Sequence, residues 1–476
     1  MLNMSLIYQI LMIGIGLFVL LLLIILNRWR KYPEKSLYYN VLSVLLNPLR
    51  VFKLSKYKQG NLTIDSSFKY AMKKTGLDDF GKESTTFTSY SAVMNQGSQK
   101  SLIFSNLGYL SAQIELNMTF VRKLKTVEWL KLFPQVLNVP VKSPTFVMGL
   151  PRTGTTFIHR LLSLDPSVRS PYLWELLAPT PIIKEERNPL NDKSIQAHEA
   201  DRDKRAKYVK KLFQFRKTLG DSALQHIHEV DWNLHEECLF ALSDELPVAS
   251  CLLYSCYLTW ENMIKIDGNS AYKWYKKQLQ LLSYQIGEIN NNNTRRWVLK
   301  CPAHLLYIKS IAKIFPDAKI IWTHRHPINA IPSMCSLVKS LHQCYYENET
   351  RDDVALGRAV TDMHAKVLST ASNDIIQSKL DHSHVIYDEL IKDPKKVIQK
   401  IYKSFKWNYT TEYDDAINKY LEEDKIKRET MKKKNKGNKN NQHSYSLEEY
   451  GLSKEELTSG AYKEYSDKYN LQIPLK

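Results

Sequence analysis

From Thr145 onward, short apolar runs alternate with longer amphipathic segments. Four of these runs are rich in apolar and β-branched residues and each is followed by a helix signal, which predicts strands at Thr145–Gly149, Trp297–Lys300, Lys319–Thr323 and His384–Tyr387. Runs of this kind are typical of parallel strands that are buried on both faces. The pattern therefore predicts an α/β fold, with a parallel sheet flanked by helices.

Helical patterning fills most of the remaining chain. Residues 28–140 are expected to form a juxtamembrane stem followed by a helical N-terminal subdomain. A helical insertion, residues 170–290, separates the first two strands and includes an amphipathic helix at 271–286. Because such insertions cover the carboxyl ends of the strands, this one is expected to form the wall on the acceptor side of a site.

The segment Leu6–Leu26 is apolar except for Tyr8, Gln9 and its glycines. Its length suits a bilayer-spanning helix, and no convincing cleavage site follows it. Residues 1–27 are therefore predicted to be an uncleaved, single-pass anchor in the bilayer of an endomembrane such as the Golgi or the endoplasmic reticulum. Basic residues after the span favour a cytosolic main domain, whereas Asn-x-Ser/Thr sequons at Asn3, Asn61, Asn117, Asn292, Asn348 and Asn408 favour a lumenal one, so both topologies stay open.

Charge narrows the range of partners. The chain has 67 Lys plus Arg against 49 Asp plus Glu, a net charge of +18, which suits an anionic ligand or an anionic membrane surface. No zinc-finger spacing and no aromatic–basic RNA motif is present, so no nucleic-acid partner is expected. The basic stretch at residues 425–442 is interpreted as a solvated loop.

Residues 144–162 (PTFVMGLPRTGTTFIHRLL) predict a buried strand, a glycine-bearing turn and an amphipathic helix. Strand, loop and helix N-terminus together form an arrangement that binds phosphate groups through backbone N–H groups and the helix dipole. The spacing from Gly149 to Gly154 is that of a P-loop, but Thr155 stands where a nucleotide triphosphatase needs lysine. A cation comes earlier, at Arg152.

Two further cations end predicted strands: Lys300 in WVLKCPAH and Arg325 in KIIWTHRHP. Because the carboxyl ends of parallel strands share one edge of a sheet, Arg152, Lys300 and Arg325 can converge on one anionic ligand. Arginine suits bidentate phosphate recognition, and lysine suits a point contact to a transferring oxygen.

These motifs carry a family resemblance. The loop PRTGTTF (151–157) resembles the 5′-phosphosulfate-binding loop of sulfotransferases, and HRHP (324–327) with Ser333 resembles their 3′-phosphate-binding element. The resemblance extends over residues 145–452 and is closest to the branch with the segments LKCPAHL (299–305), EEC (236–238), WYKKQLQLL (274–282) and HSYSLEEYGL (443–452). It implies a P-loop-like sulfotransferase domain at 141–460, a C-terminal tail at 461–476, 3′-phosphoadenosine 5′-phosphosulfate (PAPS) as donor, and no metal.

The resemblance also implies roles for individual residues. The 5′-phosphosulfate would be held by Arg152, Thr153, Gly154, Thr155 and Thr156, with Phe157 stacked on the adenine. Arg325 and Ser333 would bind the 3′-phosphate, and Tyr387 would lie near the adenine. The basic loop around Lys436 and Gly437 would close over the donor. Arg152 and Lys300 would stabilise the charge that develops during transfer.

An acceptor hydroxyl must lose a proton, so one positioned base is expected. Glu175 resembles the glutamate base of the tyrosylprotein branch and is favoured over His304. His228, Glu229, Glu236 and Glu237 match no common zinc template, and the two adjacent glutamates are interpreted as part of the acceptor wall.

Two other classes of protein compete with a sulfotransferase. A P-loop kinase or NTPase would need a lysine after Gly154 and an acidic residue at a strand end. An inactive, membrane-anchored binding protein would be expected to lose charge at Arg152, Lys300 or Arg325, and all three are present. The acceptor, a hydroxyl or amine of a carbohydrate, lipid, small molecule or tyrosine, stays open.

Overall fold

The computed structural model describes residues 19, 21–27, 41, 63–94, 104–182, 192–218, 230–254, 261–288, 294–347, 351–435 and 446–473. The predicted membrane span therefore lies largely outside the described residues, and Lys436 and Gly437 lie wholly outside them. Among the residues that are described, no helix combines the length and the apolar character needed to cross a bilayer.

The centre of the fold is a five-stranded, all-parallel sheet with the order β2-β3-β1-β4-β5. Its strands are β1 (Thr145–Gly149), β2 (Val168–Arg169), β3 (Arg296–Lys300), β4 (Lys319–His324) and β5 (Asp381–Ile386). This confirms the predicted α/β fold and its four predicted strands, although Tyr387 begins a helix instead of ending β5. The edge strand β2 escaped prediction because its two residues are too few for a periodic signal.

Alternate residues of the central strands face two separate cores. Along β1, Phe146 and Met148 belong to a large core, whereas Val147 belongs to a smaller one. The same alternation places Trp322 of β4 in the large core and Ile321 in the small one. Side chains alternate between the faces of a strand, so these apolar runs bury both sides of the sheet.

Helices fill both sides of the sheet. The N-terminal subdomain contains α3 (Ile64–Thr75), α4 (Thr86–Met94), α5 (Asn106–Leu132) and the 3-10 helix η2 (Pro134–Asn138). Between β1 and β3 lie α6 (Thr155–Leu162), α7 (Leu173–Leu177), α8 (Asp192–Thr218), α10 (Leu239–Leu242), α11 (Val248–Tyr254), α12 (Glu261–Lys265) and α13 (Asn269–Tyr284). The second half adds η4 (Pro302–Tyr307), α14 (Ile308–Ile314), α15 (Pro327–Tyr345), α16 (Asp353–Ser378), α17 (Tyr387–Lys392), α18 (Pro394–Ser404), α19 (Thr411–Asn435), η7 (Glu448–Tyr450), η8 (Glu456–Thr458) and α20 (Gly460–Lys468).

Two segments differ from what the sequence suggested. Residues 425–435, expected in a solvated loop, continue helix α19, whose first turns are held by the buried residues Tyr413 and Ile417. Lysine, arginine and glutamate are good helix formers, so a basic composition does not end a helix. The segment expected as a tail forms α20, which buries Tyr462 and Tyr465 in the large core.

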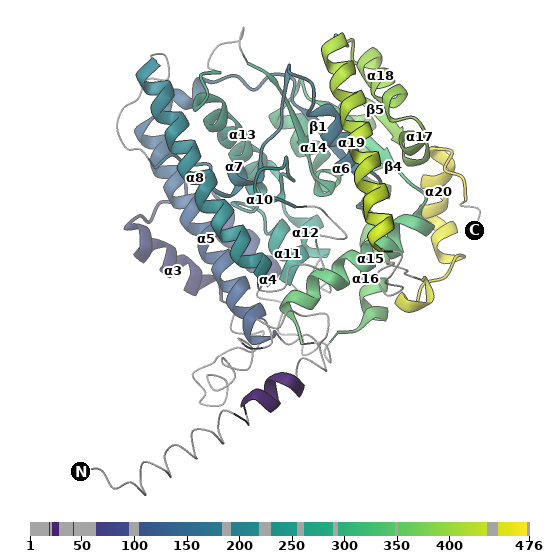
Figure 1. The fold of residues 1–476 in the computed structure, drawn as a ribbon, viewed down its shortest axis with the longest axis horizontal. Helices are drawn as coiled ribbons and strands as arrows, with labels where there is room; N and C mark the ends of the chain where they lie inside the picture. The colour runs from purple at the N-terminus through teal and green to yellow at the C-terminus, as the bar shows by residue number, and fades with distance from the viewer. Residues whose placement is uncertain are drawn as a thin grey trace, which may run out of the picture.

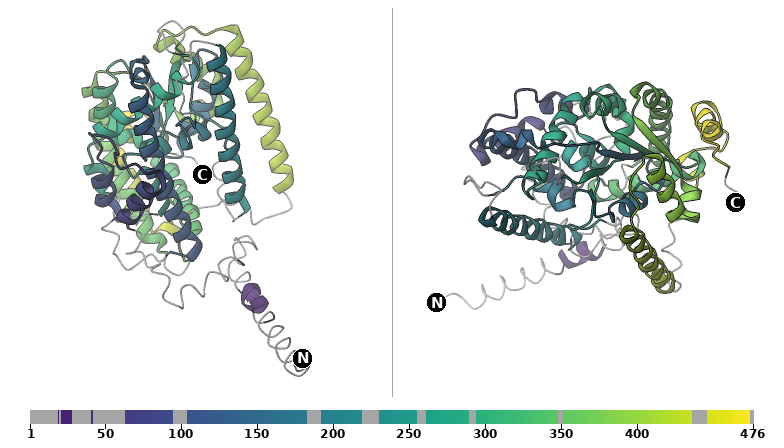
Figure 2. Two further views of the ribbon diagram at one scale, coloured as in Figure 1. Left: turned by 90° about the vertical axis from the view of Figure 1, so that its left-hand side faces the viewer. Right: turned by 90° about the horizontal axis from the view of Figure 1, so that it is seen from above.

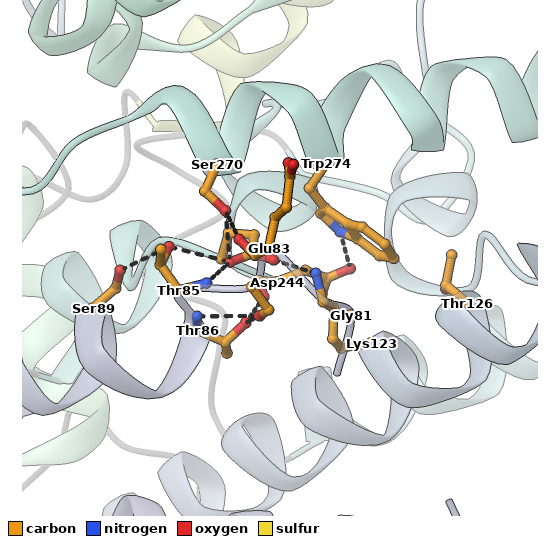
Figure 3. Close-up of polar contacts among 12 residues, drawn as sticks. Gly81, Glu83, Thr85, Thr86, Ser89, Lys123, Thr126, Asp244, Ser270 and Trp274 are labelled. Carbon is orange, nitrogen blue, oxygen red and sulfur yellow. Dashed lines mark hydrogen bonds and ion pairs between the residues drawn. The ribbon is translucent and has the colours of Figure 1, made fainter. Parts of the chain in front are cut away.

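The N-terminal subdomain is joined to the insertion by a buried polar network (Figure 3). Lys123 of α5 forms an ion pair with Glu245, and Arg122 Nε donates to Asp244 Oδ1 at 2.8 Å. The other carboxylate oxygen of Asp244 accepts from Trp274 Nε1 of α13 at 3.1 Å. In Figure 1, α3, α5 and α8 lie on one side of the molecule and α17–α20 lie on the other. The network fixes the insertion that faces the strand ends.

Candidate functional site

The loop between β1 and α6 approaches β4 closely. A Cβ atom on Gly149 would lie 2.3 Å from Thr323 Oγ1, a contact that no side chain could tolerate. Thr153 Oγ1 donates to the Leu150 carbonyl oxygen at 2.6 Å and lies 2.7 Å from Thr323 Oγ1. The loop is therefore fastened to the sheet by its own side chains.

The same loop turns through left-handed backbone conformations. Gly154, the N-cap of α6, has φ 89°, and Arg152 has φ 69°, which is uncommon for a residue with a side chain. Strained positions of this kind concentrate at ligand sites, where the surrounding structure holds them. The N–H groups in the first turn of α6 have no partner within the helix, which is the arrangement that suits an anion.

Arg152 and Arg325 lie together, as the strand-end argument predicted. Arg325 Nη1 donates to the Arg152 carbonyl oxygen at 3.0 Å, and Arg152 Nε donates to Ser333 Oγ at 3.1 Å. The guanidinium of Arg325 lies over the ring of Tyr387, 4.3 Å from its centroid. These four residues come from the loop, from the position that follows β4, from α15 and from α17, and they surround one position at the strand edge.

Lys300 ends β3 and completes the group of cations. Its Nζ donates to Thr156 Oγ1 at 3.3 Å, which ties it to the start of α6, and to Glu237 Oε1 at 2.8 Å. Burial alone would lower the pKa of this fully buried ammonium group, but the carboxylates of Glu237 and Glu236 raise it above its ordinary value. Lys300 therefore stays positively charged at neutral pH.

Glu237 is the site residue that sequence reasoning did not assign to catalysis. Two backbone–backbone hydrogen bonds position its segment: Cys238 N–H donates to the Lys300 carbonyl at 2.9 Å, and Glu236 N–H donates to the Pro171 carbonyl at 3.1 Å. The Glu237 N–H also donates to Glu236 Oε2 at 2.9 Å. The Glu237 side chain keeps 16 % exposure, whereas that of Lys300 has none. Glu237 thus contacts the buried ammonium group while its own side chain stays partly exposed.

Glu175 lies in a different setting from the one expected of a base. Its Oε1 accepts from Arg169 Nη2 at 3.0 Å and its Oε2 accepts from the Tyr172 backbone N–H at 3.1 Å. Arg202 adds a second ion pair at 3.6 Å. With only 2 % exposure, Glu175 closes a capping box at the start of α7.

His304 is also buried. Its Nδ1 lies 2.6 Å from the hydroxyl oxygen of Tyr272, and its ring packs edge-on against Phe146. Burial, and secondarily the charge of Lys300, lower the pKa of His304 to about 3. The imidazole is therefore neutral at physiological pH and is inaccessible to a bulky acceptor.

Phe157 packs beside the smaller core, and the guanidinium of Arg428 on α19 lies 5.7 Å from its ring centroid. Helix α19 therefore passes the start of α6, close to the residue predicted to meet the adenine. Within the described ranges, no three His, Cys, Asp or Glu side chains are grouped so as to hold a metal ion.

Together these residues present two guanidinium groups, one ammonium group and a helix N-terminus along one edge of the sheet, with one carboxylate beside the ammonium. Such a set binds an extended anion with two charged ends. The carboxylate can accept a proton from a group that approaches along the insertion.

The comparisons with known proteins all point to one family. A sequence model described as the Sulfotransferase family matches residues 144–411, more than half of the chain. The omega-hydroxy-beta-dihydromenaquinone-9 sulfotransferases Stf3 of Mycobacterium bovis and Mycobacterium tuberculosis are each 24 % identical over 273 residues, which is 55 % of this chain and 62 % of theirs. The similarity therefore spans less than two thirds of the length of these relatives.

Two solved structures share the fold. Sulfotransferase STF9 from Mycobacterium avium has a TM-score of 0.67 and covers 86 % of this chain and 97 % of its own. Sulfotransferase STF1 from Mycobacterium tuberculosis H37Rv has a TM-score of 0.61 and covers 86 % and 98 %. Each is 24 % identical in sequence, so the likeness concerns the fold.

Proposed function

Because the chain belongs to the sulfotransferase family, we propose that it transfers the sulfuryl group of PAPS to a hydroxyl group of a membrane-borne acceptor. The observation that carries this proposal is the contact of Lys300 Nζ with both Thr156 of the anion loop and Glu237 of the insertion. Those contacts join a donor-binding loop to a candidate base through one buried cation. The family match does not favour the kinase alternative.

The residues at the strand edge fit such a donor. Arg325 Nε is buried and has no hydrogen-bond partner among the described residues, as expected of a donor atom that serves an absent anion. Arg325 and Ser333 would hold the 3′-phosphate. Arg152, Thr156 and the start of α6 would hold the 5′-phosphosulfate, which accounts for the strained loop.

In the proposed reaction, the acceptor oxygen forms a bond to sulfur while the bond from sulfur to the 5′-phosphate oxygen breaks. The electron pair of that bond leaves with 3′-phosphoadenosine 5′-phosphate. Arg152 and Lys300 stabilise the negative charge that builds on the oxygens around sulfur. The acceptor proton passes to a carboxylate of the protein.

We assign that carboxylate to Glu237. Its position beside Lys300 supports the assignment, because a base must lie near the oxygen that attacks sulfur. Glu175 has both oxygens engaged by Arg169 and the Tyr172 backbone, and His304 is bonded to Tyr272 inside the large core. On this proposal Glu175 and His304 are positioning residues of the walls around the site.

The acceptor class and the membrane location rest on two observations. Residues 6–26 form an apolar run long enough to span a bilayer. The Stf3 relatives are named for action on an omega-hydroxy menaquinone, which is a lipid alcohol. We infer an anchored enzyme of the endomembrane system that acts on the hydroxyl group of a lipid.

The experiment uses the full chain in nanodiscs, with sulfur-labelled PAPS and a total lipid extract. Label should appear in a lipid product, together with 3′-phosphoadenosine 5′-phosphate, and Lys300→Met should abolish both. Chelator should not change the rate. Transfer of phosphate from γ-labelled ATP in place of sulfur would overturn the proposal, and so would binding of PAPS without any labelled product from the lipid extract.

A further inference from the structure

Helices α8 and α19 share an uneven distribution of charge. In α8, residues 192–203 contain four acidic and two basic residues, whereas residues 204–218 contain seven Lys or Arg and no acidic residue. In α19, residues 411–424 contain six acidic residues and one basic, whereas residues 425–435 contain six basic residues and one acidic. Each helix is therefore acidic in its first half and basic in its second.

The helix dipole does not account for this distribution. Basic residues near a helix C-terminus are favourable, but the effect is confined to the last turn. The basic half of α8 covers about four turns and that of α19 about three. A second reason is therefore needed for charge that extends so far along both helices.

The two basic halves lie at the same end of the molecule. In Figure 1, α8 and α19 both run downward on the face toward the viewer, with α8 on the left and α19 on the right, and the left view of Figure 2 shows both on that same face. The described N-terminal helical residues, 21–27, lie beyond the same end (Figure 1). The chain thus brings its two longest basic segments to the side where its apolar segment lies.

Exposed apolar side chains accompany the charges. Tyr208 of α8 is 57 % exposed among the exposed residues Lys207, Lys210 and Lys211. Ile426 of α19 is 56 % exposed between Lys425 and Lys427, which are also exposed. Tyrosine and aliphatic residues that are flanked by lysines suit the interface of a bilayer.

We propose that residues 204–214 of α8 and 425–430 of α19 form a basic surface that binds the headgroups of anionic lipids. The bound surface would hold the domain against the bilayer, with the long axes of both helices directed toward the membrane. The inference concerns docking alone and does not depend on the proposed sulfuryl transfer. It commits to an anionic bilayer because the surface combines positive charge with exposed apolar groups, which a soluble anion would not require.

Hydrogen exchange of the full chain in nanodiscs tests this surface. In discs of phosphatidylcholine with phosphatidylserine, amides of 204–214 and 425–430 should exchange about five-fold more slowly than in discs of phosphatidylcholine alone. High salt should remove the difference, because it screens surface charges. Equal exchange in the two kinds of disc would overturn the proposal.

A variant and a ligand sharpen the test. Lys207, Lys210, Lys425 and Lys427 changed together to Gln should lose the protection, whereas the same change at four other exposed lysines, Lys69, Lys73, Lys74 and Lys82, should keep it. Exchange within β1 and β4 reports whether each variant is folded. If addition of 3′-phosphoadenosine 5′-phosphate in neutral discs slows exchange of these amides as much as anionic lipid does, the surface binds the nucleotide and the proposed membrane contact is wrong.

Discussion

Replacement of Glu237 by Gln is the sharpest test of the proposed site. The change removes the carboxylate that lies 2.8 Å from Lys300 Nζ while keeping the size of the side chain and one hydrogen-bond acceptor. If Glu237 receives the acceptor proton, kcat should fall by about 10²- to 10⁴-fold, the usual contribution of a positioned base.

The affinity for the donor nucleotide should stay the same or increase. At 2.8 Å and an effective dielectric constant of about 20, the gross attraction between the Glu237 and Lys300 charges is about 6 kcal/mol, part of which is offset by desolvation. In the free protein this attraction competes with the donor for the same ammonium group. The Gln variant should therefore bind 3′-phosphoadenosine 5′-phosphate as tightly as the parent, or up to about tenfold more tightly.

Label-transfer kinetics give kcat, and isothermal titration calorimetry gives the Kd of the nucleotide. Glu237→Asp, which keeps the charge, should recover part of kcat, and thermal denaturation should show that each variant is folded. A fall in kcat accompanied by an equal loss of nucleotide affinity would indicate a structural role. A kcat within about threefold of the parent would return the role of base to Glu175 or His304.

Four further outcomes are expected. Arg325→Ala should weaken nucleotide binding by about 1.5–3 kcal/mol, and calorimetry with an analogue that lacks the 3′-phosphate should show no difference between variant and parent. Lys123→Met leaves Glu245 as an unpaired buried charge, because the two side chains are 1 % and 2 % exposed, and urea denaturation should show a loss of about 3–5 kcal/mol. Glu175→Gln breaks the buried pair with Arg169 and should lower the free energy of unfolding by about 3 kcal/mol while kcat per folded molecule changes by less than about tenfold. The pKa of His304 is lowered to about 3 in the folded state, so between about pH 6.5 and pH 3 only the unfolded state binds a proton there. The free energy of unfolding should therefore fall as the pH falls through this range, and urea titrations of His304→Gln should show a slope smaller by up to about 1.4 kcal/mol per pH unit.

The arrangement of the cations at the strand edge follows largely from the sequence. Apolar runs predict β1, β3 and β4, and because parallel strands share a carboxyl edge, they also predict that Arg152, Lys300 and Arg325 lie at the same edge. Glycine spacing located the loop, and the 2.3 Å approach of a Cβ on Gly149 to Thr323 Oγ1 gives the reason for that glycine. These features are local or are fixed by the topology of the sheet.

The acceptor side does not follow in the same way. Glu237 is 63 residues from Lys300 in the chain, and hydrogen bonds from its neighbours to Lys300 and Pro171 bring it to the strand end. Nothing in the periodicity of an irregular segment reports such bonds. Glu175 shows the opposite problem: a glutamate in the right region of the sequence is engaged by Arg169 and a helix N-terminus, partners that only the packing reveals.

The contact of Glu237 with Lys300 also bears on the order of binding. In the free protein one oxygen of the carboxylate, Oε1, accepts from the ammonium group. A donor sulfuryl group that draws on the same ammonium group weakens this contact, so the carboxylate becomes a better proton acceptor when the group to be transferred is in place. The geometry therefore favours donor binding before productive acceptor binding. Lys300, through one ammonium group, would couple the two halves of a reaction whose residues come from β3, α6 and the insertion.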